Sequence, residues 1–191
     1  MWGKYCIIDK RVDIGLDTVI MNYVEIGRNT VIGSDCYIDS RVSISGGVAI
    51  GNNVTLRHGV ILAKGSAVGD NTYIAPRVIT HNLNSDKKEL DGVIIGKNCF
   101  IGSHAIIQHG ISICDNVTIG AGTLVLKDIT EPGTYVNSYG DGKIHITKIS
   151  APPEKDFICY KETQNFVGCL QGCDRCKVHF KLTAAYLKEN K

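Results

Sequence analysis

The stretch from residue 24 to residue 44 reads VEIGRNTVIGSDCYIDSRVSI, and an isoleucine recurs in it at every sixth position. These isoleucines are Ile26, Ile32, Ile38 and Ile44. Extended in both directions, the same step falls on an aliphatic residue from Ile8 through Ile74. A second run, in a new phase, extends from Ile95 to Val125. A period of six fits neither an α-helix, which repeats every 3.6 residues, nor a plain strand, which repeats every 2.

Each six-residue unit reads as a short strand followed by a turn. The residue two positions before the isoleucine is small or β-branched, as at Val24 and Cys36. The residue directly after the isoleucine is often glycine, as at Gly27. Residues two apart on a strand face the same side, and glycine or asparagine tolerates a tight corner with positive φ. Stacked units would bury one aliphatic column, with backbones about 4.8 Å apart. The pattern therefore predicts an all-β fold, a parallel β-helix. A sandwich or barrel would give irregular spacing and longer alternation.

The interval from Ile74 to Ile95 is 21 residues, which is three units of six plus three more. A coil cannot absorb the extra residues and stay in phase, and the aliphatic pattern fails at Thr80. We therefore expect residues 81–92, HNLNSDKKELDG, to leave the helix as a polar loop. A loop held by a rigid scaffold is a common place for a functional site.

Composition limits the classes of function. The 191 residues include 21 Lys and Arg and 19 Asp and Glu without a basic block, so nucleic acid is not an expected partner. The sequence has neither an apolar run of about 18 residues nor an N-terminal signal-like segment, which predicts a soluble, cytoplasmic protein without a membrane span. In that setting the 8 cysteines are expected to be reduced or metal-bound rather than paired in disulfides.

Residues 71–129 carry the motifs IAP, a histidine that opens the expected loop, CFIGSHA, IGAG and KDI. With these motifs the chain resembles the hexapeptide-repeat acyltransferases over residues 6 to about 136. It is similar to the O-acetyltransferases of galactosides, maltose and nodulation factors, and to the acyltransferases of nucleotide-linked amino sugars. The resemblance implies a left-handed coil, a hand opposite to the usual preference of parallel crossovers. It also implies a homotrimer, acetyl-CoA as co-substrate and active sites between neighbouring subunits.

The expected reaction is acetylation of a hydroxyl or amino group on a sugar or nucleotide-linked amino sugar, in the synthesis of cell-surface polysaccharide. The resemblance makes His81 the general base. An imidazole with an ordinary pKa of about 6.5 can accept the acceptor's proton near neutrality. His58 is the rival base, and His81 could instead be a loop histidine that caps a corner. Arg57, His58 and Asn82 are expected to contact the acceptor.

The resemblance also assigns residues to acetyl-CoA: Gly102 and Ser103 in GSH, Ala121 and Gly122 in GAG, and Lys127 in LKD. Small residues would let the pantetheine lie close to the coil, and a lysine suits a phosphate. The same glycines could serve turn geometry alone. The family often ends its helix with a GNPA-like segment, where this chain has VNSYGDGKIHIT. How the adenine end is held therefore stays open.

Two other functions were weighed. The γ-class carbonic anhydrases share the fold and bind zinc through three histidines, for which His81, His104 and His109 have similar spacing. Their pattern resembles IGHxxxxHG, whereas here IGSHAIIQHG places the first histidine one residue later, and their RGD-like element is missing. A zinc hydratase is thus the less favoured alternative. The third possibility is a β-helix that serves only as a scaffold.

We divide the chain into a catalytic β-helix over residues 1–136, with its loop at 81–92, and a C-terminal extension over 137–191. In the extension, Cys169, Cys173, Cys176 and His179 have a spacing that could hold zinc or an iron–sulfur cluster. The favoured interpretation is a short helix, about Val178 to Asn190, with unpaired thiols. We expect no metal in the catalytic domain.

Overall fold

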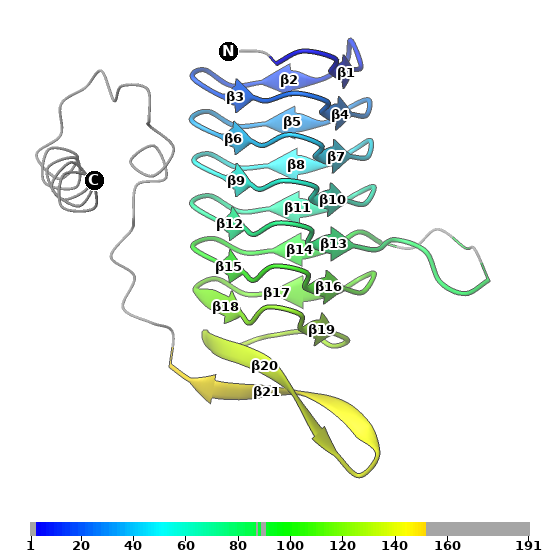
Figure 1. The fold of residues 1–191 in the computed structure, drawn as a ribbon, viewed down its shortest axis with the longest axis vertical. Helices are drawn as coiled ribbons and strands as arrows, with labels where there is room; N and C mark the ends of the chain where they lie inside the picture. The colour runs from blue at the N-terminus through cyan, green and yellow to red at the C-terminus, as the bar shows by residue number, and fades with distance from the viewer. Residues whose placement is uncertain (1–2, 87, 89–90, 152–191) are drawn as a thin grey trace, which may run out of the picture. The chain divides into compact units, whose positions relative to one another are not determined.

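The computed structural model describes residues 3–86, 88 and 91–151. Within them the chain is all-β and winds as a parallel β-helix of about seven turns (Figure 1). Each short strand pairs in parallel with the strand three places further along the chain, so three hexapeptide units make one turn. The strands form three sheets, here called A, B and C.

The strand bounds by sheet are as follows. Sheet A holds β3 (Val19–Ile20), β6 (Tyr37–Ile38), β9 (Thr55–Leu56), β12 (Tyr73–Ile74), β15 (Phe100–Ile101), β18 (Val117–Ile119), β20 (Gly133–Gly140) and β21 (Lys143–Ser150). Sheet B holds β1 (Ile7–Ile8), β4 (Glu25–Ile26), β7 (Ser43–Ile44), β10 (Ile61–Leu62), β13 (Ile79–Thr80), β16 (Ile106–Ile107) and β19 (Leu124–Val125). Sheet C holds β2 (Asp13–Ile14), β5 (Val31–Ile32), β8 (Ala49–Ile50), β11 (Ala67–Val68), β14 (Ile94–Ile95) and β17 (Ser112–Ile113).

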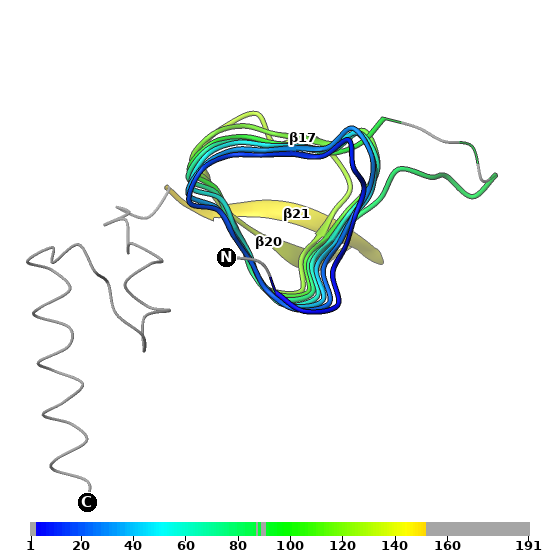
Figure 2. The ribbon, with the colours of Figure 1, turned by 90° about the horizontal axis from the view of Figure 1, so that it is seen from above.

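The three sheets are the sides of a triangular prism (Figure 2). The chain passes from sheet B to C to A, and it turns anticlockwise as it recedes from a viewer above the N-terminal end. This is the left-handed coil that the resemblance implied. The edges of the prism are named by the sheets they join: corner BC, corner CA and corner AB.

The aliphatic residue of each hexapeptide unit fills the core, as predicted. The largest fully buried side chains all occupy this position: Ile20, Ile32, Ile38, Ile44, Leu56, Leu62, Ile74, Ile95, Ile101, Ile107, Ile113 and Ile119. Removing one such side chain from water is worth about 1.5–3 kcal/mol. The smaller inward position is buried too, and there the Cys36 thiol donates to the Gly51 carbonyl at 3.1 Å. Burial raises the pKa of Cys36, so this thiol has the character of a small apolar residue.

The corners have positive φ, but not always at glycine or asparagine. Corner CA follows the expectation, with Asp or Asn at each such position. Corner AB departs from it, because large side chains adopt positive φ there, including Tyr23 at 59°, Arg41 at 62° and Arg77 at 59°. Large residues are uncommon in this region of φ and ψ. At corner AB, large outward-facing residues therefore adopt a positive φ, the backbone conformation that glycine adopts most readily.

Thr80 is a polar residue in the core, at the position where the aliphatic pattern fails. The coil nevertheless continues through it, because Thr80 is the inward residue of β13 and only 2% exposed. Its hydroxyl accepts a hydrogen bond from the Ala63 amide at 2.8 Å and lies 3.4 Å from Ser66 Oγ. The polar side chain is tolerated in the core because it is bonded there. The extruded segment begins at the next residue.

Thr80→Val should lower the free energy of unfolding by about 1–3 kcal/mol. Valine keeps the shape of the side chain but leaves the buried Ala63 amide without its acceptor. Chemical denaturation of the two proteins measures the difference. Thr80→Ser is the matched control, because it retains the hydroxyl. Equal stability of the valine variant and the wild type would show that this hydrogen bond contributes nothing.

A hairpin closes the C-terminal end of the coil. Strand β20 adds in parallel to β18 and then pairs with β21 in antiparallel fashion, through the turn residues Asp141 and Gly142, both with positive φ. The Asn137 side chain accepts from the Leu124 amide at 2.7 Å and donates to the Leu124 carbonyl at 3.0 Å. The Asn137 side chain thus makes the hydrogen bonds to Leu124 that the backbone of a further strand of sheet B would otherwise make. Strand β20 crosses residue 136, where we placed a boundary, and that boundary stays a prediction.

The predicted helix near the C-terminus, together with Cys169, Cys173, Cys176 and His179, lies outside the described residues. In the part of the chain that is described, no helix has the length and apolar character needed to span a membrane.

Candidate functional site

The extruded segment leaves the coil at corner BC, between β13 and β14, where the sequence placed it (Figures 1 and 2). Both ends are fixed to the coil. At the first, the His81 amide donates to the Ile107 carbonyl at 3.0 Å. At the second, Gly92 lies so close to the backbone of Gly65 that a Cβ atom would collide with it. The root of the segment is therefore held rigidly.

The segment folds back on itself around Asn84. The Asn84 carboxamide oxygen accepts hydrogen bonds from the amides of Asp86 and Lys88, each at 3.0 Å, and the Asn84 amide donates to the Lys88 carbonyl at 3.3 Å. Asparagine favours such local turns because its side chain reaches backbone groups a few residues ahead. Leu83, between this turn and the root, is 52% exposed.

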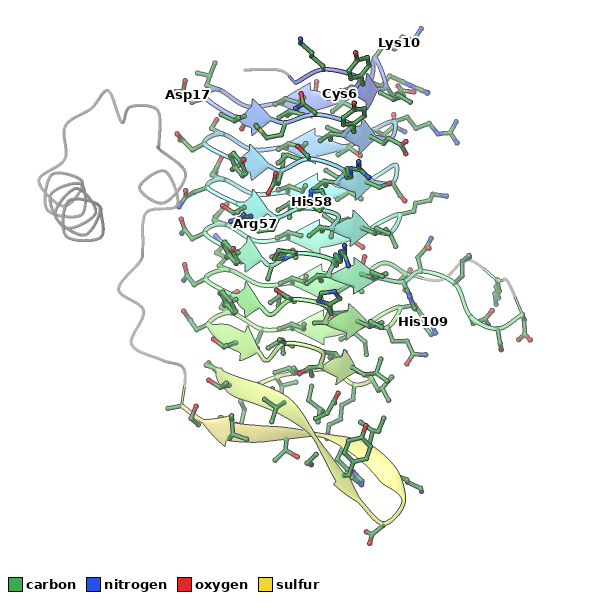
Figure 3. All side chains as sticks on the ribbon, in the orientation of Figure 1. Cys6, Lys10, Asp17, Arg57, His58 and His109 are labelled. Atoms are coloured by element: carbon green, nitrogen blue, oxygen red, sulfur yellow. The ribbon has the colours of Figure 1, made fainter. Side chains whose placement is uncertain are left out.

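His81 lies at the root with its side chain exposed, and Asn82 beside it is half-buried. The β-ladder register places Gln108 and then Leu126 below His81 on successive coils. His109, half-buried, is therefore close to the root of the segment, as Figure 3 shows. Lys127 is at the same corner two coils below. Corner BC thus holds His81, Asn82 and Lys127 of the predicted site residues.

The other predicted residues gather at corner AB. Ser103 is half-buried, and Ala121 and Gly122 are exposed on the coil below it. Because these residues are small, no large side chain projects from this part of the surface. Around Gly122, an added Cβ atom would have no neighbour within 4 Å. Gly102 has a different reason to be glycine, because its Cβ would lie 2.5 Å from the Ala121 amide nitrogen of the next coil. Packing between coils explains Gly102 without a ligand.

Arg57 and His58 lie higher on corner AB, on adjacent positions (Figure 3). Arg57 Nε is 3.2 Å from Asp39 Oδ2, and its Nη1 is 3.4 Å from the Tyr73 hydroxyl. Asp39 also accepts from the Ser40 amide at 2.7 Å. These contacts orient Arg57. His58 is exposed.

Within one chain, the two groups occupy opposite edges of sheet B. Four residues separate Arg77 at corner AB from His81 at corner BC, which is about 13 Å in an extended strand. Sheet B therefore lies between the predicted residues at corner AB and those at corner BC. The structure thus brings together the residues predicted to bind acetyl-CoA, apart from Lys127, but holds them away from His81 of the same chain.

A cavity of about 200 Å³ lies beside Lys127, between the last coil and the hairpin. Leu124, Leu126 and Lys127 line it from the coil, and Ile144, His145 and Ile146 from β21. One wall is therefore apolar and one cation stands at the rim. Ile144, His145 and Ile146 belong to the segment VNSYGDGKIHIT, which stands where related sequences often have a GNPA-like ending.

The histidines considered for zinc do not converge in one chain. His104 is at corner AB, whereas His81 and His109 are at corner BC. Among residues 3–86, 88 and 91–151, no group of three or more His, Cys, Asp or Glu side chains is arranged to hold a metal ion.

Sequence reasoning missed two basic residues at corner AB, Arg41 and Arg77, and considered a third, His104, only as a zinc ligand. All three are exposed and have positive φ. The signal was available, because each of these three residues stands three positions after a core residue, namely Ile38, Ile74 and Ile101. Only the three-sided coil shows that these positions form one column.

Two family models match the chain. Residues 29–64 match the bacterial transferase hexapeptide (six repeats), and residues 92–127 match the hexapeptide repeat of succinyl-transferase. This chain is a hexapeptide-repeat protein. The resemblance inferred from the motifs is thereby confirmed, and both runs of the hexapeptide repeat, before and after the extruded segment, contribute to it.

Two sequence relatives share short segments with the chain. The UDP-3-O-acylglucosamine N-acyltransferase of Bordetella avium is 46% identical over 46 residues, which is 24% of this chain and 13% of that protein. The galactoside O-acetyltransferase of Escherichia coli is 54% identical over 37 residues, 19% of this chain and 18% of that protein. The matches thus span less than a fifth of either relative.

Among solved structures, the UDP-N-acetylglucosamine acyltransferase of Francisella novicida superposes with a TM-score of 0.51 at 18% identity. The superposition covers 64% of this chain and 55% of that one. At this identity the likeness shows a shared hexapeptide-repeat fold.

Proposed function

We propose that this protein is an acyltransferase that moves an acetyl group from acetyl-CoA to a hydroxyl or amino group of a sugar or nucleotide-linked amino sugar. The observation that carries the proposal is the rigid root of the extruded segment, which places the exposed His81 beside coils of the transferase repeat. Both sequence relatives support the reaction class, because one is an N-acyltransferase and the other an O-acetyltransferase.

In the proposed reaction the acceptor oxygen or nitrogen attacks the thioester carbonyl. A new bond to the acetyl carbon forms, the carbon–sulfur bond breaks, and coenzyme A leaves as the thiol. His81 takes the proton that the acceptor loses and passes it to the leaving sulfur. No covalent enzyme intermediate is needed. His81 is suited to this role because its backbone is fixed while its side chain remains accessible.

Acetyl-CoA fits the low surface of corner AB in this proposal. Ser103, Ala121 and Gly122 would let the pantetheine approach the coil closely. Lys127 and the cavity against β21 offer a cation and an apolar wall at corner BC, which suit a phosphate and a flat ring. Arg57, His58 and Asn82 are proposed to contact the acceptor.

The proposed assembly is a homotrimer with sites between chains. Corner BC of one chain would face corner AB of its neighbour, which joins the base to the cofactor surface that lies about 13 Å away in its own chain. The outer face of sheet B is apolar at Ile61, 41% exposed, and at Ile79 and Ile106, which are half-buried, so it can pack against a second copy. Because acetyl-CoA and nucleotide-linked sugars are cytoplasmic compounds, we place the reaction in the cytoplasm, in the supply of cell-surface polysaccharide.

Release of free thiol from acetyl-CoA, measured over a panel of sugars and nucleotide-linked amino sugars, tests this function. We expect thiol release that depends on one class of acceptor, with equimolar acetylated product. No release with any acceptor, together with stoichiometric zinc in the purified protein, would favour the zinc hydratase. Neither release nor zinc would favour the scaffold.

Ala121→Tyr should raise the KM for acetyl-CoA at least 10-fold, because a phenol ring would stand on the low surface where the pantetheine is placed. The side chain is exposed, so the fold should be unaffected. Steady-state kinetics with varied acetyl-CoA measures the change, and Ala121→Ser is the control that keeps the position small. An unchanged KM in the tyrosine variant would place the coenzyme elsewhere.

A further inference from the structure

One column of outward residues runs along corner AB at the positions with positive φ. From the N-terminal end its members are Tyr5, Tyr23, Arg41, Gly59, Arg77, His104 and Gly122. Successive members stand on successive coils, about 4.8 Å apart. Tyr5 and Tyr23 stack with ring centroids 5.1 Å apart, and Arg41 Cζ lies 5.9 Å from the Tyr23 centroid. The upper part of the column is therefore a continuous stack.

The stack is interrupted at Gly59, between two arginines. Arg41 is one coil above and Arg77 one coil below, so their backbones are about 10 Å apart. A Cβ atom at Gly59 would have only Arg77 Cγ within 4 Å, at 3.5 Å. We call this place the Gly59 notch, formed by Arg41, Gly59 and Arg77 with His58 beside it. The side chains of Arg41, His58 and Arg77 are exposed.

Charge is segregated between the corners of the prism. Corner CA carries Asp17, Asp35, Asp70 and Asp115 with Lys97 as a basic residue paired to Asp70, whereas corner AB carries Arg41, Arg57 and Arg77 against Asp39 alone between residues 39 and 122. Asp39 is engaged by Arg57 at 3.2 Å. Within residues 3–86, 88 and 91–151, no carboxylate pairs with either notch arginine, Arg41 or Arg77.

The donors at the notch are available to a ligand. The cation–π contact of Arg41 with Tyr23, at 5.9 Å from the ring centroid, uses none of the guanidinium N–H groups as hydrogen-bond donors. Guanidinium groups bind phosphate oxygens through paired N–H donors. Because Gly59 has no side chain, phosphate oxygens would have room to approach the coil between Arg41 and Arg77.

From the notch we infer a binding site for the diphosphate of a nucleoside diphosphate, which makes the acceptor a nucleotide-linked sugar rather than a free galactoside. The inference rests on the proposed function for the identity of the reaction. Ser103 is two coils below His58 in the same register, about 10 Å along the corner. A sugar attached to a diphosphate at the notch would extend toward the surface proposed for the thioester.

Calorimetric titration of the full chain with UDP, dTDP and GDP, without acyl donor, tests the site. We expect saturable binding of at least one nucleotide that weakens at least 10-fold in Gly59→Asp relative to Gly59→Asn. The two variants fill the notch with side chains of the same shape, but only aspartate places a negative charge between the arginines. Both should fold, since Asp35 and Asn53 adopt φ of 59° and 53° at corner CA. Thermal melts check this.

Two further variants separate a built site from a general positive field. Arg41→Gln with Arg77→Gln should weaken nucleotide binding at least as much as Gly59→Asp, whereas Arg28→Gln, an exposed arginine at corner BC, should leave it unchanged. Absence of binding in the wild type, equal binding by the Asp and Asn variants, or equal losses in Arg28→Gln would overturn the inference. Displacement of the bound nucleotide by adenosine 3′,5′-bisphosphate would also overturn it, since the notch would then belong to coenzyme A. Because no acyl donor is present, failure of thiol release leaves this measurement intact.

Discussion

His81→Ala should reduce kcat by about 10²–10⁴-fold, the range found when a general base is removed. The KM for acetyl-CoA should change little, because the proposed coenzyme surface at Ser103 and Ala121 lies at another corner. The free energy of unfolding should also be unchanged, since the imidazole is exposed and the backbone bond to Ile107 remains. Thiol-release kinetics with saturating acceptor gives kcat, and denaturant titration gives stability.

His109→Ala is the matched control for this experiment, because it removes an imidazole near the root of the same segment. We expect it to retain at least a tenth of the wild-type kcat. If His81→Ala is as active as the wild type, His81 is not the base, and His58→Ala becomes the next variant. A large loss of stability in His81→Ala would mean that the residue is structural.

At an acetyl-CoA concentration well below the raised KM of Ala121→Tyr, two poorly active proteins should regain activity when mixed, if the site is shared between chains. In trimers reassembled from equal amounts of His81→Ala and Ala121→Tyr chains, roughly a quarter of the boundaries would combine an intact base with an intact cofactor surface. At that acetyl-CoA concentration the mixture should therefore recover roughly a quarter of the wild-type rate, which is at least an order of magnitude above the His81→Ala parent. Thiol release measured before and after reassembly reports the gain.

Light scattering accompanies this measurement and should give about three times the chain mass. The control mixes His81→Ala with a chain that carries both substitutions, because no boundary can then be intact. Mixed trimers that remain inactive would place base and cofactor in one chain. A fully active monomer would remove the need for a partner altogether.

Much of the fold was predictable because one constraint repeats in every unit. A single aliphatic residue per hexapeptide must face the core, so Ile26 or Ile101 could be placed inside without knowledge of its neighbours. The length of the interruption similarly located the extruded segment. Thr80 was harder to interpret, because its burial depends on the Ala63 amide, which belongs to the preceding turn. Contacts that are distant along the chain leave no periodic signal.

The site was predictable in its members but not in their arrangement. Motif resemblance named His81 and Ala121, but their positions at different corners become visible only when the three hexapeptides of each turn are assigned to three sheets. Arg41 and Arg77 escaped notice because each is separated from the next by 18 or more residues and neither belongs to a motif. The hairpin was missed as well, because the expected family ending is absent and Asn137 reaches Leu124 only in three dimensions.

The Asn137 contact has a consequence for how the protein behaves at high concentration. Identical parallel strands spaced about 4.8 Å apart are also the geometry of amyloid, in which each new chain docks on an open backbone edge. At β19 that edge is already occupied, because one carboxamide takes both the amide and the carbonyl of Leu124. An incoming strand finds neither donor nor acceptor at that residue. The fold resembles an amyloid fibril in its strand spacing. The hairpin thus helps to prevent chains from stacking end to end into a fibril.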